Sequence, residues 1–210
     1  MRTHSKTSQE SLTPSDALQF LKEGNMRFCQ NLKANRDLLK QVNETRDGQW
    51  PFAAILSCID SRASVELIFD QGLGDVFSVR IAGNFVNDDI LGSLEFACAV
   101  AGAKLVVVLG HSACGAIKGA CDHVELGNLT QMLAKIAPAV DAVSPDYAAE
   151  TRNSSNDEFV ERVARENVAQ TVAAIAERSA VLKGLKDKGN IDIVGGMYDI
   201  ASGEVTFLDN

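Results

Sequence analysis

KLVVVLGH (residues 104–111) is the stretch of sequence that decides the fold. Lys104 and Gly110 flank an unbroken run of Leu and Val, which is typical of a strand buried on both faces of a parallel sheet. FAAILSC (52–58) and DVFSVRIAG (75–83) predict two further strands, and IDIVGGMYDIASGEVTF (191–207) predicts a final pair around Ser202-Gly203.

The segments between these strands have helical features. Residues 64–74 predict a short helix that ends at a glycine turn, and residues 88–103 predict a longer one. Residues 156–188 form a long amphipathic helical region, with apolar positions at Phe159, Val160, Val163, Val168, Val172, Ile175 and Leu182. Strands that alternate with helices predict an α/β fold with a mainly parallel β-sheet flanked by helices.

We expect an N-terminal tail and helical arm over residues 1–35, followed by a single α/β domain over residues 36–210. Residues 1–12 predict disorder. Thr13 and Pro14 predict the start of a helix, which Gly24 and Asn25 weaken in its middle and which needs a surface to pack on. Residues 35–49 are polar and predict loop or short helix.

The overall charge limits the possible partners. The formal net charge of −8 and a pI of about 4.9 repel phosphate backbones, so we expect no nucleic-acid binding. No apolar run is long enough to cross a bilayer, and the N-terminus lacks the features of a secretory signal. An odd number of cysteines, Cys29, Cys58, Cys98, Cys114 and Cys121, indicates reduced thiols in the cytoplasm.

Residues able to bind a metal follow two of the predicted strands. SCIDSR (57–62) and HSAC (111–114) lie at strand ends, where parallel sheets form their sites, so Cys58, Asp60, His111 and Cys114 are expected to converge. Two thiolates and one imidazole make a three-ligand zinc site of the catalytic type. Water, substrate or, in a closed state, Asp60 would take the fourth position.

Arg62 explains how Asp60 could stay off the metal. Its guanidinium can hold the carboxylate in a bidentate ion pair, which leaves Asp60 to orient a zinc-bound hydroxide toward an electrophile. Successive side chains of an extended segment point to opposite sides, so Cys58, Asp60 and Arg62, at every second position, are predicted to share one side. Because two thiolates offset the charge of Zn²⁺, bound water should be acidified less than in an all-histidine site.

These residues resemble the motifs of the β-class carbonic anhydrases. The resemblance joins C-x-D-x-R (58–62) to H-x-x-C within GHSACGAIKG (110–119), and extends through VRIAGN (79–84), SLEFA (93–97), NVAQTV (167–172) and GGMYD (195–199). It implies one Zn²⁺ per subunit on Cys58, His111 and Cys114, and reversible hydration of CO₂ to bicarbonate by attack of zinc-bound hydroxide. It also implies homodimers or homotetramers in which an N-terminal helix packs on a partner subunit.

The resemblance also indicates a plant-like, type I site. It implies that Gln49 and the N–H of Gly115 bind substrate, and that the apolar pocket consists of Phe77, Ala82 and Phe96. Members regulated by bicarbonate have tryptophan where this chain has Ile55, so that regulatory site is expected to be missing. We expect the hydration rate to rise with pH through a value above neutral.

The chain departs from the family pattern at two places, and several alternative roles for the cysteines and the site stay open. Ala63-Ser64 replaces the usual V-P or V-C, and Val100 stands where some members place a proton-carrying histidine, which leaves His123 as a candidate by sequence proximity. Each cysteine alone could be an ordinary buried residue. The same site could hydrolyse CS₂ or COS, hold a purely structural zinc, or use Cys58 or Cys114 as a nucleophile with His111.

Overall fold

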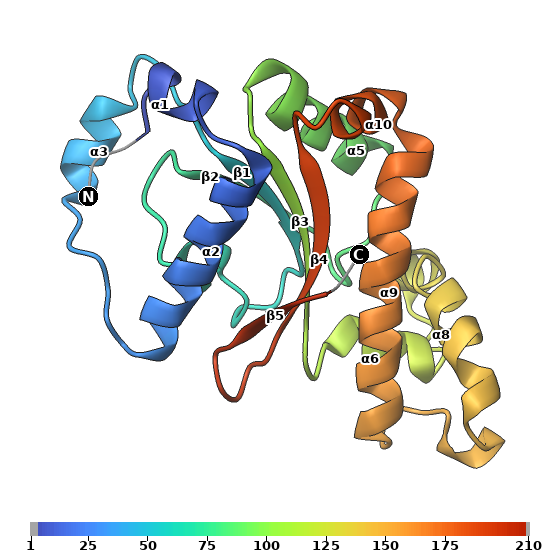
Figure 1. Cartoon of the computed structure of the whole chain (residues 1–210). Coiled ribbons are helices and arrows are strands. Elements are labelled where there is room, and N and C mark those ends of the chain that lie inside the picture. The colour runs from blue at the N-terminus through green and yellow to red at the C-terminus, as the bar shows by residue number, and fades with distance from the viewer. Residues whose placement is uncertain (1–3, 209–210) are drawn as a thin grey trace.

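A five-stranded sheet forms the centre of the protein (Figure 1). The computed structural model describes residues 4–208. The strands lie in the order β2-β1-β3-β4-β5, with the bounds β1 Ala53–Ser57, β2 Val76–Arg80, β3 Leu105–His111, β4 Asp192–Tyr198 and β5 Val205–Phe207. Among residues 4–208, β4 and β5 are the only strands that pair antiparallel. The predicted α/β fold with a mainly parallel sheet is confirmed.

Helices cover both faces of the sheet (Figure 1). One face packs against α5 (Asp88–Glu95), α6 (Gly115–Cys121), α8 (Ala137–Val143), α9 (Asp157–Arg178) and α10 (Ala180–Asp187). The other packs against α2 (Pro14–Cys29) and α4 (Val65–Ile68). The remaining helical elements are α1 (Lys6–Glu10), α3 (Leu38–Glu44), η1 (Phe96–Val100), α7 (Gly127–Leu133), η2 (Ser144–Asp146) and η3 (Ala149–Thr151). Within residues 4–208, no helix has the length and hydropathy to cross a membrane.

Three predicted helices differ in extent from those observed. The helix predicted over 64–74 is limited to the short α4, and the one predicted over 88–103 is α5 followed by the π-helical turn η1. The long region over 156–188 divides into α9 and α10 at Ser179. The Ser179 hydroxyl donates to Glu95 Oε1 at 2.6 Å and accepts from the N–H of Leu182, so a tertiary contact stabilises this break.

The N-terminal segment is ordered from residue 4 on, and the prediction of disorder over 1–12 is wrong there; residues 1–3 lie outside the described part. Gln9 is buried on α1, and its amide donates to the carbonyl oxygens of Pro51 and Ala101 at 2.6 and 2.8 Å. His4 contacts the ring of Phe52 with a centroid distance of 5.4 Å. These long-range contacts hold a polar segment that has no strong local preference.

Helix α2 begins at Pro14, and the side chain of the N-cap residue Thr13 caps it as predicted. Its Ala17 and Leu21 are fully buried against the sheet of the same chain. Gly24 does not interrupt the helix: a Cβ there would lie 1.8 Å from the Phe69 carbonyl oxygen, so glycine permits the close approach of α2 to α4. Contact of this arm with a partner subunit, and the boundary between residues 35 and 36, stay predictions.

Candidate metal centre

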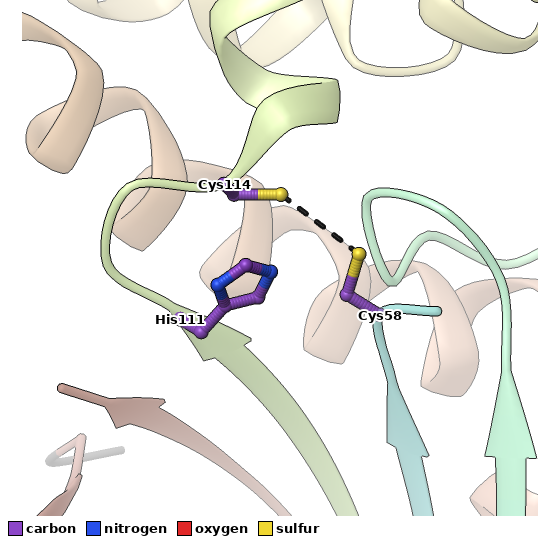
Figure 2. Close-up of side chains that lie close together, drawn as sticks. All are labelled: Cys58, His111 and Cys114. Carbon is purple, nitrogen blue, oxygen red and sulfur yellow. Dashed lines mark hydrogen bonds between the residues drawn. The ribbon is translucent and has the colours of Figure 1, made fainter. Parts of the chain in front are cut away.

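The metal-binding residues lie at the carboxyl ends of two neighbouring strands. Cys58 directly follows β1, His111 is the last residue of β3, and Cys114 occupies the N-cap position directly before α6. Because β1 and β3 pair side by side, their ends bring the three side chains toward one another, as Figure 2 shows. Ala113 has a positive φ of 53°, which tightens the turn between His111 and Cys114.

The three donor atoms form a compact, buried cluster. One ligand atom from each of Cys58, His111 and Cys114 lies within 4.8 Å of the others, and the two Sγ atoms are 3.9 Å apart. The residues are 4%, 1% and 1% exposed, respectively. Sulfur and imidazole nitrogen are the donors that zinc prefers, so this set fits the ion that the sequence predicts.

The imidazole of His111 is oriented for a metal. Its Nδ1 lies 3.0 Å from the carbonyl oxygen of Ser112. Because a carbonyl oxygen only accepts hydrogen bonds, this contact requires the proton on Nδ1 and leaves a lone pair on Nε2. His111 Nε2 is buried and has no hydrogen-bond partner among residues 4–208. A buried polar atom without a partner is costly, and a cation between the thiols would provide one.

The thiols of Cys58 and Cys114 have pKa values shifted in opposite directions. A hydrogen bond from Cys114 lowers the pKa of Cys58 to about 4, whereas that contact, together with burial, raises the pKa of Cys114 well above its usual range. The contact thus favours the ionised form of Cys58 and disfavours a second thiolate at Cys114. A divalent ion would favour loss of the second proton and balance both thiolates.

Asp60 is held beside this cluster by Arg62. The guanidinium donates from Nε to Oδ1 at 2.9 Å and from Nη2 to Oδ2 at 2.8 Å. The backbone N–H of Arg62 also donates to Oδ1. These hydrogen bonds hold the pKa of Asp60 far below its usual range. Asp60 Oδ2 lies 4.0 Å from His111 Nε2, so an ionised carboxylate stands next to the metal position.

The prediction that Cys58, Asp60 and Arg62 share one side of an extended segment is wrong. Strand β1 ends at Ser57, and Cys58 to Arg62 do not form an extended segment. A turn closed by the Ala63 N–H and the Asp60 carbonyl folds Arg62 back onto the carboxylate. The proximity follows from this turn rather than from strand alternation.

Arg80 is a further residue of the centre that sequence reasoning missed. It is the last residue of β2, paired with Ser57 of β1. Its side chain donates to the carbonyl oxygens of Cys58 and Asp60 at 3.0 and 2.6 Å. It thereby fixes the backbone on both sides of Ile59. Only the pairing of β1 with β2 reveals this role, although Arg80 lies in the VRIAGN motif.

Comparison with known proteins agrees with the geometry. The family model for carbonic anhydrase matches residues 53–205. Carbonic anhydrase 2 of Mycobacterium tuberculosis is 36% identical over 202 residues, which cover 94% of each chain. The solved β-carbonic anhydrase CafA of Aspergillus fumigatus is 30% identical, with a TM-score of 0.72, over 93% of this chain and 90% of that one.

The chain belongs to the β-carbonic anhydrase family. This family catalyses the zinc-dependent hydration of CO₂, and Cys58, His111 and Cys114 form a cluster in this chain that could hold the metal. A tetrameric β-carbonic anhydrase of Sordaria macrospora shares the fold, with a TM-score of 0.72 at 23% identity over 81% of this chain and 90% of that one.

The predicted substrate residues of this β-carbonic anhydrase lie at different distances from the metal site. Gly115 directly follows Cys114, and a Cβ built on it would meet no atom of another segment within 4 Å. Ala82 adjoins Gly83, whose N–H donates to Cys58 Sγ at 3.4 Å. Gln49 is exposed and precedes β1, so a strand of about 3.3 Å per residue separates it from Cys58.

Phe77 and Phe96 line a groove along the edge strand β2. Their rings pack edge to face with centroids 6.2 Å apart. Phe77 pairs with Ala54 of β1, so about 10 Å of strand separates it from the level of Arg80. His123 lies beyond the far end of α6, and Val100 is 73% exposed on η1. None of these four residues is part of the buried cluster of Cys58, His111 and Cys114.

Proposed function

We propose that this protein catalyses the reversible hydration of CO₂ to bicarbonate and a proton, with one zinc ion per subunit on Cys58, His111 and Cys114. One observation supports this above all. Three buried donor atoms converge within 4.8 Å, next to a carboxylate whose two oxygens are held by Arg62. A site with a fourth fixed ligand would not need that restraint.

Zinc held by Cys58, His111 and Cys114 would supply Lewis acidity, which would lower the pKa of water and so provide hydroxide as a nucleophile. Asp60 accepts the hydrogen of that nucleophile and so turns an oxygen lone pair toward CO₂. Arg62 keeps the carboxylate ionised and engages both of its oxygens in hydrogen bonds, which corresponds to the open, type I state. Ile55 supports the absence of the second bicarbonate site, because it is fully buried in β1 where regulated members have tryptophan.

Substrate is proposed to bind between the start of α6 and the Ala82 loop. Gly115 is the first residue of α6, directly after Cys114. The first N–H groups of a helix have no partner within the helix, so the Gly115 N–H can donate to an oxygen of CO₂ or bicarbonate. Gln49 could reach this position only from a second subunit, because β1 separates it from Cys58 in its own chain. Phe77 and Phe96 would complete an apolar pocket only when a second subunit covers the groove that they line.

Self-association is therefore part of the proposal. We propose a dimer or tetramer formed through the β2 edge, where Phe96 and Val100 are 52% and 73% exposed, with the N-terminal arm on a partner. The relative from Sordaria macrospora is tetrameric. A cytoplasmic location is proposed because all five cysteines are free. Light scattering at micromolar concentration tests the assembly, and a monomer that is fully active would contradict it.

The decisive experiment compares Cys58→Ser with Cys98→Ser. Both cysteines are buried, but Cys98 lies on η1, outside the metal cluster. Stopped-flow CO₂ hydration and zinc analysis should show that Cys58→Ser loses metal and activity, whereas Cys98→Ser keeps both. Equal zinc content and equal rates in the two variants would reject the assignment, and parallel assays with CS₂ and COS would identify the preferred substrate.

A further inference from the structure

A backbone N–H approaches the metal ligand Cys58 from the loop after β2. The Gly83 nitrogen lies 3.4 Å from Cys58 Sγ, within the range of an N–H···S hydrogen bond. Gly83 has a φ of 79°, and a Cβ there would lie 2.4 Å from Ile136 Cδ1. The residue at this position must therefore be glycine if the N–H is to face the sulfur.

The loop is held in place from α9. The side-chain Nδ2 of Asn167 donates to the Gly83 carbonyl oxygen at 2.8 Å, across 84 residues of sequence. Asn167 is 3% exposed and lies between Val163 and Val168, both fully buried, on the face of α9 that packs on the sheet. A buried amide on an apolar face is costly unless it is hydrogen-bonded, and Gly83 provides the bond.

We propose that Asn167 is a positioning residue for the zinc centre: it fixes Gly83 so that the Gly83 N–H donates to the Cys58 thiolate. The hydrogen bond withdraws charge from one sulfur and orients it toward the metal, as groups behind metal ligands do. This withdrawal partly offsets the neutralisation of Zn²⁺ by two thiolates. The inference rests on the proposed zinc ligands and assigns a role to NVAQTV that the ligand set does not explain.

The test replaces Asn167 by leucine, which removes the donor without adding charge. The matched control is Asn25→Leu, because Asn25 is also buried and its amide donates to the Gly203 carbonyl oxygen at 2.8 Å, on the face of the sheet opposite the metal. Zinc affinity is measured by competition with a chelator, and the sulfur-to-cobalt charge-transfer band is recorded after Co²⁺ substitution.

We expect Asn167→Leu to bind zinc about 10-fold to 100-fold more weakly and to shift the cobalt band. Asn25→Leu should keep the wild-type affinity and band even if it melts at a lower temperature. Wild-type affinity and an unchanged band in Asn167→Leu would overturn the proposal, as would an equal loss of affinity in Asn25→Leu.

A measurement on the unaltered protein decides the question if a variant does not fold. After substitution with ¹¹³Cd, the N–H···S bond should produce a scalar coupling between the cadmium and the Gly83 amide proton. Absence of this coupling in a protein that is active with zinc refutes the role of Gly83 and Asn167 alone. A wild-type protein that binds no zinc refutes the proposed function itself.

Discussion

Replacing Gly83 by alanine should destabilise both the fold and the metal centre. Gly83 has a φ of 79°, and a left-handed backbone costs a residue with a Cβ about 1–2 kcal/mol. The new methyl would lie 2.4 Å from Ile136 Cδ1 and 3.4 Å from Ala116 Cβ. Ile136 is fully buried, so it cannot move freely, and overpacking of this kind costs about 1–3 kcal/mol.

The two costs together predict a loss of about 2–5 kcal/mol in the free energy of unfolding. For a chain of 210 residues, 1 kcal/mol corresponds to about 2–4 °C in Tm, so Gly83→Ala should melt roughly 4–20 °C below wild type. Calorimetry at fixed protein and zinc concentrations measures this shift. Zinc affinity should fall as well, because relief of the clash moves the N–H away from Cys58.

Gly184→Ala is the matched control for this change. Gly184 lies within α10, and a Cβ there meets no atom within 4 Å. Alanine is favoured over glycine in a helix by about 1 kcal/mol, so this variant should melt at or above the wild-type temperature with unchanged zinc affinity. The reasoning fails if Gly83→Ala melts within about 1 °C of wild type, or if both variants lose stability equally.

Three further outcomes are expected. Arg62→Ala should retain zinc but lower kcat, measured by stopped-flow assay, at least about 10-fold. Asp60 loses its restraint in this variant, and a positioned proton acceptor contributes about 100-fold or more to the rate. An unchanged kcat would remove Arg62 from the mechanism. Burial alone would raise the pKa of Asp70, but the ion pairs with Arg27 and Arg36 outweigh burial and lower the pKa from 3.8. The ionised carboxylate therefore stabilises the fold fully above pH 3.8, and this contribution is lost as the pH falls below that value. In an acid titration of unfolding, Asp70→Asn should lose less stability than wild type. Chelation should abolish activity and added Zn²⁺ restore it, whereas activity that survives chelation but not thiol alkylation would support a cysteine nucleophile instead.

Much of the sheet and the ligand set could be predicted because both depend on local patterns. Leu105 to Leu109 form an unbroken apolar run, and all five are buried in β3, since a central parallel strand has helices on both faces. The ligands follow from the same reasoning: residues directly after neighbouring parallel strands must meet at one edge. The short spacing from His111 to Cys114 needs only a turn.

The contacts that orient these ligands could not be predicted in the same way. Asn167 meets Gly83, and Gln9 meets Ala101, across 84 and 92 residues, and no periodicity in the sequence records which donor will face which carbonyl. The break at Ser179 and the approach of Arg80 to the Cys58 carbonyl also depend on neighbours from other elements. Sequence alone therefore determined the strands and the convergence of the candidate metal donors, because burial and strand direction act on local segments. Only the tertiary structure decided how those donors are held, because hydrogen bonds between distant segments depend on the completed packing of helices on the sheet.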